Sequence, residues 1–336
     1  MDEYLVAVNR ELRKLVQAPD RTYASYYGML QYHLGWVDAD FNAVDVDPGK
    51  RLRPLLSLLS CEAVSGEWEP ALPVAVAIEL AHNFSLIHDD IEDRSDARRG
   101  RPAVWKVWGL AQGLNAGDGM FVLARLALDR LRHQGLPVEK RTALNTIFDE
   151  ATLALCQGQF LDLGFESRLD VTVDEYLEMI RGKTAALISA ATRLGAMVRT
   201  DNPGLLGPLA RFGENVGLSF QIADDILGIW GDPSITGKSA ATDVLAKKKS
   251  LPAIFGLTHR EVGPRLRQIY GQETLREQDV EQVLGLLDAA GAREYAQEKA
   301  DGFRTAALAA LDETGLKNRP TDQLREIAQR MTRRDR

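Results

Sequence analysis

Two clusters of aspartates are the residues of this sequence best suited to chemistry. The first is the run DDIED at 89–93, and the second is the pair Asp224 and Asp225; each follows an apolar stretch that should be buried. Carboxylates in such a place repel one another and are costly to desolvate unless a cation compensates them. Asp89 and Asp93 are four residues apart, so a helix projects both from one face. Oxygen-only ligands favour Mg²⁺, which is usually shared with substrate phosphates.

A solvated acidic helix end is the alternative interpretation of either cluster. A single DDxxD pattern does not exclude it, because charged helix ends are common on protein surfaces. Two acidic clusters in one chain, each behind an apolar helix, favour the metal site. Asp224 and Asp225 are then expected to serve further ions from an opposing helix.

Basic residues near the first cluster indicate an anionic substrate. The segment GKRLRP places Lys50 and Arg53 at the start of a helix, where exposed backbone amides already favour an anion. The segment RRG at 98–100 lies just downstream of the first acidic cluster. It supplies Arg98 and Arg99, whose fork-shaped guanidinium groups are suited to clamp a diphosphate.

Further basic residues accompany the second cluster. Lys183 precedes Thr184 inside an apolar helix, where an ammonium without an anion is costly. Lys238 follows Gly237 in a loop, and Lys248 belongs to a run of three lysines. Each of these taken singly is an ordinary surface charge. Together with the arginines they indicate two anion sites beside a metal cluster.

Helices must position these groups, because nearly the whole chain has helical periodicity. Leu5, Val8, Leu12 and Leu15 step by three and four residues along one face. The same pattern fills 54–65, 72–93, 117–132, 139–166, 172–198, 205–229 and 278–312. Breakers rich in Gly, Pro and Asp separate these segments, and period-two runs of Val, Ile and Thr are absent from the sequence. We therefore expect an all-α fold, organised as a single domain over residues 1–336.

Composition excludes several classes of protein. The chain has 336 residues, of which 45% are hydrophobic and 26% charged, as in ordinary globular proteins. Cys61 and Cys156 are too few for a disulfide framework or a cysteine-rich zinc site, which favours a reducing, cytoplasmic location. The net charge of −7 argues against nucleic acid as a partner. Glu79, Arg181 and Arg193 interrupt the best candidates for a membrane span, and the acidic N-terminus is unlike a signal peptide.

Six ordered segments resemble the motifs of the trans-isoprenyl diphosphate synthases, the polyprenyl synthetase family. The segments are GKRLRP, IELAHNFSLIHDDIED followed by RRGRP, GQFLDL, RGKTAALI, FQIADD and GK…D…KKKSLP, and they span about 49–252. One DDxxD is a weak signal, whereas six motifs in the right order are specific. The resemblance implies the isoprenoid synthase fold, a single large helical bundle around a deep central cavity, and a homodimer.

The resemblance also implies a role for each matching residue. The positions that match the isopentenyl diphosphate site are Lys50, Arg53, His82 and Arg99. The positions around the allylic diphosphate are Arg98, Lys183, Thr184, Gln221, Lys238 and Lys248. The catalytic set is Asp89, Asp90, Asp93, Asp224, Asp225 and Lys183. The resemblance implies three Mg²⁺ ions that are bridged by substrate. Their implied protein ligands are Asp89, Asp93 and Asp224.

The chain departs from the family pattern at Gly228. The second cluster often reads DDxxD, and here glycine takes the place of its last carboxylate. Because Asp224 remains, we expect metal binding to survive with altered affinity for one ion. His82 lies seven residues before Asp89 and, without the resemblance, is interpreted as a core histidine. Phe160 is expected to be a packing residue.

The activity that the resemblance implies is prenyl transfer with chain elongation. Magnesium assists ionisation of the allylic diphosphate, and the double bond of isopentenyl diphosphate then attacks the cation in an apolar cavity that excludes water. A class I terpene cyclase also ionises a prenyl diphosphate but needs no second diphosphate site, so GKRLRP and RRG argue against it. Intact acidic clusters and basic clamps argue against a non-catalytic synthase subunit.

Product length is expected to depend on the helix that carries DDIED. Phe84, Ala81 and Ile78 precede Asp89 by five, eight and eleven residues, which places them roughly 7.5 to 16 Å below it. A bulky ring beside small residues predicts a partial floor for the growing chain. An aromatic here, without an insertion in the first cluster, resembles archaeal-type geranylgeranyl synthases, so we expect a twenty-carbon product. Farnesyl diphosphate is the alternative, and Phe84 as ordinary core packing stays open.

Overall fold

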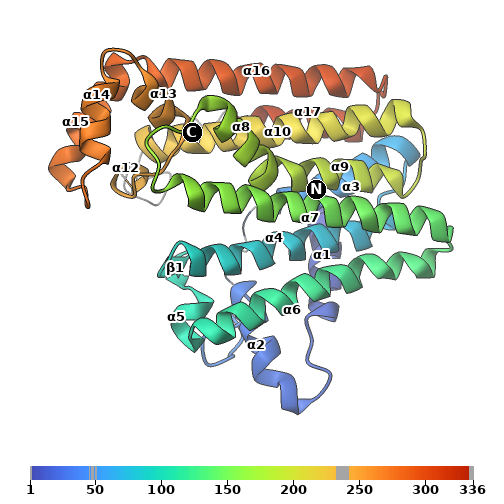
Figure 1. Cartoon of the computed structure of the whole chain (residues 1–336). Coiled ribbons are helices and arrows are strands. Elements are labelled where there is room, and N and C mark those ends of the chain that lie inside the picture. The colour runs from blue at the N-terminus through green and yellow to red at the C-terminus, as the bar shows by residue number, and fades with distance from the viewer. Residues whose placement is uncertain (1, 45, 47–48, 50, 232–241, 333–336) are drawn as a thin grey trace. The chain divides into compact units, whose positions relative to one another are not determined.

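The computed structural model describes residues 2–44, 46, 49, 51–231 and 242–332. Helices make up nearly all the regular structure of these residues, which confirms the all-α prediction (Figure 1). The chain groups into two compact units. Unit 1 contains Met1–Phe148 and Leu194–Asp201, and unit 2 contains Asp149–Arg193 and Asn202–Arg336. Two boundaries fall inside the helices α7 (Val138–Phe165) and α9 (Ala186–Met197), and the third, between Asp201 and Asn202, falls in the loop after α9. The single domain stays a prediction.

The helices of unit 1 centre on one long core helix. They are α1 (Asp2–Leu15), α2 (Ala24–His33), α3 (Leu52–Ser65), α4 (Leu72–Glu92), α5 (Val104–Trp108) and α6 (Leu110–Asp129), with 3₁₀ segments at Arg21–Tyr23, Glu69–Ala71 and Arg130–Gln134. The helix α4 packs along α6 and against α3 (Figure 1). Every residue from Val74 to Ala81 is buried, as expected for a helix that is apolar on all sides. Glu69–Glu92 meets the length and hydropathy of a membrane span, and 67% of that window is buried inside the fold.

A short hairpin follows α4, where the sequence predicts no strand. Its strands β1 (Ala97–Arg98) and β2 (Arg101–Pro102) are antiparallel. The two turn residues, Arg99 and Gly100, both have positive φ, 51° and 73°, as a type I′ turn requires. The hairpin was missed because two-residue strands contain no alternating pattern.

Unit 2 is built on α10 and α16, which lie side by side (Figure 1). Its elements are α8 (Val173–Ile180), the π-helical segment η4 (Arg181–Ala185), α10 (Pro203–Trp230), α12 (Thr242–Leu245), α13 (Leu251–Thr258), α14 (Gly263–Tyr270), α15 (Glu277–Ala289), α16 (Ala292–Glu313) and α17 (Arg319–Thr332). The predicted helix 278–312 is two helices, because Gly291 has φ 67° and ends the first of them.

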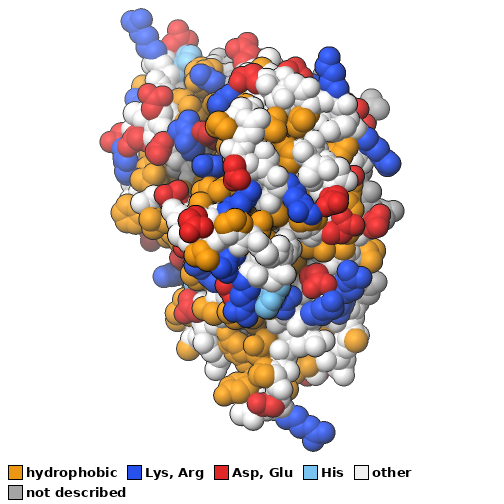
Figure 2. Space-filling view, turned by 90° about the vertical axis from the view of Figure 1, so that its right-hand side faces the viewer, with side chains coloured by type: hydrophobic (Ala, Val, Ile, Leu, Met, Phe, Trp, Pro, Cys, Tyr) orange, Lys and Arg blue, Asp and Glu red, His pale blue; other side chains and the backbone are white. Residues whose placement is uncertain are grey.

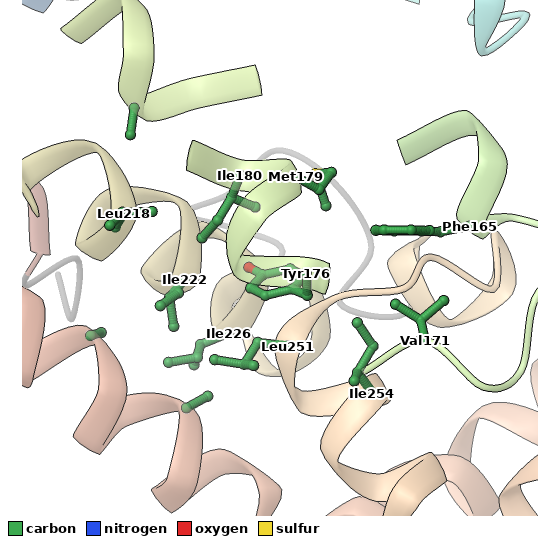
Figure 3. Packing of buried hydrophobic residues seen from close by; sticks show 13 residues of the cluster. Phe165, Val171, Tyr176, Met179, Ile180, Leu218, Ile222, Ile226, Leu251 and Ile254 are labelled. Carbon is green, nitrogen blue, oxygen red and sulfur yellow. The ribbon is translucent and has the colours of Figure 1, made fainter. Parts of the chain in front are cut away.

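Tyr176 of α8 lies within an apolar cluster of unit 2 (Figure 3). Ile180, Ile222, Ile226 and Leu251 surround its ring and come from α8, α10 and α13. A buried tyrosine needs a partner for its hydroxyl group. That partner is the carboxylate of Asp225, so this core has a polar contact at its centre.

Some apolar side chains remain on the surface. Phe160 of α7 is 75% exposed, so the expectation that it packs in the core is wrong. Leu153, seven residues earlier, is also exposed, because both residues lie on the same outward face of α7. Figure 2 shows acidic and basic side chains interspersed with apolar ones on one face, without a dominant patch of a single sign.

Candidate active site

Arg53 enters the site of unit 1 from the first turn of α3. Its Nη1 lies 3.2 Å from Nε2 of His82 on α4. Because a guanidinium can only donate, Nε2 of His82 accepts and the ring is neutral. Burial lowers the pKa of Arg53 to about 10, and the charge of Glu79 opposes this shift. Lys50, predicted beside Arg53, lies outside the described residues.

Two histidines line this arginine site: His33 is buried and His82 is half-buried. Burial, followed by the charges of Arg53, Arg99 and Arg98, holds the pKa of His82 well below its usual value. Burial and the charges of Arg99 and Arg98 do the same for His33 of α2. Sequence reasoning missed His33, because the segment before residue 49 carries no family motif.

The hairpin brings Arg98 onto the first acidic cluster. Its Nε and Nη2 both lie 2.7 Å from Oδ1 of Asp90, and Nη2 lies 3.6 Å from Oδ2 of Asp89. Asp90 is 1% exposed, and burial raises the pKa of its carboxyl group although Arg98 opposes the shift. Asp90 therefore positions Arg98.

Asp89 and Asp93 close the C-terminal end of α4. Asp93 is the C-cap, and its backbone N–H donates to the carbonyl of Asp89 at 2.9 Å. Asp89 is half-buried and Asp93 exposed. Carboxylates at a helix C-terminus face the negative end of the helix dipole, which makes them unfavourable without a cation.

Asp225 is the centre of the site in unit 2. It is 1% exposed, and its Oδ2 accepts from the hydroxyl of Tyr176 at 2.6 Å and from the backbone N–H of Leu251 at 3.1 Å. Its Oδ1 accepts from Gln221 Nε2 and Lys248 Nζ, both at 3.2 Å. Asp225 thus joins the apolar cluster of Figure 3 to the polar site, and it positions Gln221 and Lys248.

Lys248 remains an ammonium although its side chain is half-buried. Burial alone would lower its pKa, but the carboxylates of Asp225, Asp243, Asp224 and Asp162 outweigh it and raise the pKa. Asp162 comes from the GQFLDL segment, to which the sequence assigned no role. Lys238, predicted near Lys248, lies outside the described residues.

Lys183 and Thr184 lie on the π-helical turn of unit 2. The Nζ of Lys183 lies 2.5 Å from Oδ2 of Asp162, and the hydroxyl of Thr184 donates to Oε1 of Gln221 at 2.8 Å. A π turn often occurs at a functional site, because it re-aims side chains within a helix. The structure therefore brings together all four described residues predicted around the allylic diphosphate in unit 2: Lys183, Thr184, Gln221 and Lys248.

Two glycines allow the backbone of α7 to touch that of the π turn. A Cβ atom on Gly158 would lie 2.1 Å from the backbone N of Lys183, and one on Gly182 would lie 2.6 Å from the carbonyl O of Ala154. Neither distance is possible for a real side chain, so only glycine fits at 158 and 182.

The absent side chain of Gly228 leaves space that another carboxylate occupies. A Cβ atom at Gly228 would lie 2.2 Å from Oδ2 of Asp243. Asp243 also lies 3.5 Å from the Nζ of Lys248. The chain thus keeps a carboxylate beside the second cluster, supplied by α12 instead of α10.

Within each unit, the carboxylate donors are of the kind that an open magnesium site uses. Within the described ranges, no three His, Cys, Asp or Glu side chains converge into a closed metal cage. Mg²⁺ is usually held by one or two carboxylates together with waters and substrate phosphates. Asp89 and Asp93 in unit 1, and Asp224 in unit 2, provide oxygen donors of this kind.

Comparisons with known proteins agree with this geometry. The sequence model of the polyprenyl synthetase family matches residues 36–287. The chain belongs to the polyprenyl synthetase family. It is 38% identical over 321 residues to the (2E,6E)-farnesyl diphosphate synthase of Mycobacterium tuberculosis, covering 94% of this chain and 88% of that protein. It is 40% identical over 285 residues to the geranylgeranyl diphosphate synthase of the same organism, covering 84% and 80%.

Solved structures of polyprenyl synthetases are also similar to this one. The structure of polyprenyl synthetase from Streptomyces coelicolor A3(2) matches with a TM-score of 0.90 and 35% identity, over 98% of both chains. This polyprenyl synthetase is therefore a short-chain trans-prenyltransferase of isoprenoid biosynthesis. Enzymes of the family use isopentenyl diphosphate and allylic diphosphates as substrates.

Proposed function

We propose that this polyprenyl synthetase extends allylic diphosphates with isopentenyl diphosphate as far as geranylgeranyl diphosphate. The observation that carries the chain length is the ring of Phe84. It is 7% exposed and lies against Phe121 of α6, with ring centroids 5.2 Å apart and planes tilted by 58°. Ala81 and Ile78, further down α4, are fully buried. A pair of rings between α4 and α6 supports a floor that stops the growing chain.

Each substrate is assigned to the residues that the family motifs predict. Isopentenyl diphosphate is held by Arg53, His82 and Arg99, together with Lys50. The allylic diphosphate is held by the residues predicted for it, which are Arg98, Lys183, Thr184, Gln221, Lys238 and Lys248. Mg²⁺ ions bound by Asp89, Asp93 and Asp224 would neutralise the charge that develops on the leaving diphosphate. The family is generally Mg²⁺-dependent.

The reaction breaks one carbon–oxygen bond and forms one carbon–carbon bond. The allylic C–O bond ionises, and both electrons leave with the diphosphate. The double bond of isopentenyl diphosphate supplies the electrons of the new bond. A proton then leaves the condensed cation, and the departing diphosphate is the base. Apolar surroundings keep water away from the cation.

We also propose a homodimer and keep a cytoplasmic location as a prediction. The support for the dimer is a set of exposed apolar residues on α6, namely Leu110, Leu114, Val122 and Leu126. Such residues on one helix are typical of a protein interface. Light scattering of the purified protein tests the dimer directly.

One assay tests the proposed activity against its alternatives. The purified protein is incubated with isopentenyl diphosphate, dimethylallyl diphosphate and Mg²⁺, and the products are separated by chromatography. We expect a twenty-carbon diphosphate, lost with EDTA and restored with Mg²⁺. A fifteen-carbon end product would favour the farnesyl alternative. A cyclic hydrocarbon would indicate a terpene cyclase, and no product at all would indicate a subunit that needs a partner.

Phe84→Ala tests the floor itself. We expect the product distribution to lengthen by at least one isoprene unit, because the ring no longer closes the space between α4 and α6. Phe160→Ala is the matched control, since Phe160 is exposed and should not affect length. An active Phe84→Ala enzyme with unchanged products would show that the floor lies elsewhere.

A further inference from the structure

Arg51 combines two unfavourable features at the start of α3. It is the N-cap residue, with φ 43° and ψ 45° in the left-handed region that residues other than glycine rarely adopt. Its side chain is only 6% exposed. Among the residues that the structure describes, none accepts a hydrogen bond from its Nε, Nη1 or Nη2.

Packing alone does not explain a buried guanidinium in this state. The group is always charged and carries five N–H donors, so leaving it unpaired inside the protein is costly. Neighbouring arginines of unit 1 are supplied with partners. Arg98 binds the carboxylates of the first acidic cluster, and Arg101 donates to the carbonyls of Tyr32 and Val37.

The surroundings of Arg51 are short of negative charge. Glu79, 3% exposed, is the carboxylate whose charge acts on both Arg51 and Arg53. Its Oε1 accepts a hydrogen bond from Asn83 Nδ2 at 3.1 Å. Arg99 acts on Arg51 with the opposite sign to Glu79. The charge of one buried carboxylate thus acts on two arginines, while Arg99 and Arg13 add positive charge near Arg51.

His33 shows the same shortage independently. It is 8% exposed, and its Nε2 lacks a hydrogen-bond partner in the described part of the chain. It lines a small cavity of about 20 Å³ together with Arg98, Arg99 and Arg101. Two buried side chains near Arg99, from α2 and from the start of α3, therefore have polar atoms to offer to an anion.

We infer that Arg51 is a further ligand of the isopentenyl diphosphate that Arg53 and Arg99 are proposed to hold. This inference rests on the proposed function. A guanidinium fork matches the geometry of two phosphate oxygens, so the diphosphate satisfies donors that the protein leaves unused. The strained backbone at Arg51 is then a cost of the ligand-free state that binding offsets.

The experiment compares substrate affinity with the stability of the ligand-free protein. In Arg51→Gln we expect the KM for isopentenyl diphosphate, and its Kd by calorimetry without allylic substrate, to rise ten- to a hundred-fold. The KM for the allylic substrate should stay within about twofold. The melting temperature of the ligand-free variant should be unchanged or higher, because an unpaired buried charge has been removed. If Arg51 were purely structural, its replacement would lower the melting temperature of the ligand-free protein instead.

Arg51→Gly provides a second variant, because glycine relieves the positive φ. We expect the same loss of affinity with a higher melting temperature. Arg132→Gln is the control, since Arg132 is exposed and pairs with Asp129 in the same unit. Unchanged affinity for isopentenyl diphosphate, or ligand-free variants that melt lower or fail to fold, would overturn the inference. If the wild type neither binds isopentenyl diphosphate nor forms product, the proposed function itself fails.

Discussion

The two anion sites of this protein treat their cations in opposite ways. In the arginine site of unit 1, formed by Arg51, Arg53, His82 and Arg99, one guanidinium is buried without a hydrogen-bond partner among the described residues. In the lysine site of unit 2, formed by Lys183, Thr184, Gln221 and Lys248, both lysines already contact carboxylates. One site is short of negative charge, and the other is balanced before any ligand arrives.

This difference fits the two ways in which a diphosphate can be bound. A diphosphate held by the protein alone needs uncompensated cations, and arginine forks provide them with fixed geometry. A diphosphate that arrives with Mg²⁺ brings its own positive charge, so carboxylates are needed beside the lysines. The uncompensated arginines of unit 1 therefore fit the isopentenyl diphosphate that is proposed to bind without metal. The carboxylate-paired lysines of unit 2 fit the allylic diphosphate that is proposed to bind with Mg²⁺.

The largest expected effect comes from removing the proposed Mg²⁺ ligands. Asp89→Ala and Asp224→Ala should each lower turnover by roughly a hundred-fold or more, because each removes an oxygen donor for the ion that neutralises the leaving group. Steady-state kinetics across a Mg²⁺ titration measure this. Asp129→Ala and Asp312→Ala, both exposed, should retain wild-type rates. Full activity in Asp89→Ala would remove the first cluster from the site.

The next prediction separates the two sites by substrate. Arg53→Ala should mainly raise the KM for isopentenyl diphosphate, and Lys183→Ala should mainly impair the allylic substrate. A charge-assisted contact is worth roughly 1.5–3 kcal/mol, or ten- to a hundred-fold in affinity. Arg132→Ala and Lys299→Ala serve as surface controls. Equal effects of both site variants on both substrates would show that the assignment merges or misplaces the sites.

Moving the carboxylate from residue 243 to residue 228 tests whether Asp243 replaces the side chain that Gly228 lacks. Gly228→Asp should reduce activity roughly ten-fold or more, because its side chain would collide with the carboxylate of Asp243. Asp243→Ala should lower activity and Mg²⁺-pyrophosphate binding by leaving Lys248 less balanced. The double variant should recover much of both, a non-additivity that marks direct contact. Gly285→Asp, on an open face of α15, controls for the glycine change.

If the double variant recovers neither activity nor Mg²⁺-pyrophosphate binding, Asp243 does not take the place of the carboxylate missing at residue 228. Calorimetry with Mg²⁺ and pyrophosphate keeps the result independent of turnover. Wild-type behaviour of Asp243→Ala would lead to the same conclusion.

The smallest effect concerns pH and the neutral histidines of unit 1. Burial and the neighbouring arginines hold the pKa values of His33 and His82 well below 6.5 in the folded protein. Between the folded and unfolded pKa values the unfolded chain binds more protons, so stability is complete above about 6.5 and falls as pH falls. His33→Gln should therefore lose a few degrees less in melting temperature than wild type between about pH 7.5 and about pH 5.5. An identical loss in both proteins would show that other groups carry the acid sensitivity.

Much of the fold was predictable because its helices end at strong breakers. The starts and ends of α3, α4 and α10 agree with the predicted segments to within a few residues, since Gly and Pro flank them. The π turn and the hairpin were not predictable, because one extra residue in a helix and two strands of two residues each are too short to leave a distinct pattern in the sequence.

The site was predictable only where residues belong to a motif. Arg53 with His82, and Thr184 with Gln221, are motif residues that lie in contact in the structure, while their roles stay predictions. His33 lies outside every motif, and Asp162 lies in GQFLDL, a motif to which the sequence assigned no role, so only the structure brings these two residues to the charged groups. The relation of Asp243 to residue 228 was hidden for the same reason, although both lie in one stretch of sequence.

The π-helical turn Arg181–Ala185 has a consequence for how this site can change. A π turn holds one more residue than the α-helical turn it replaces. Deleting Gly182 would convert it to an ordinary turn and rotate one side of the helix by about 100° relative to the other. Thr184 would then lose its contact with Gln221, although no side chain of the site had been altered. The orientation of these side chains therefore depends on the number of residues in the turn. Insertions and deletions change that number, whereas substitutions do not.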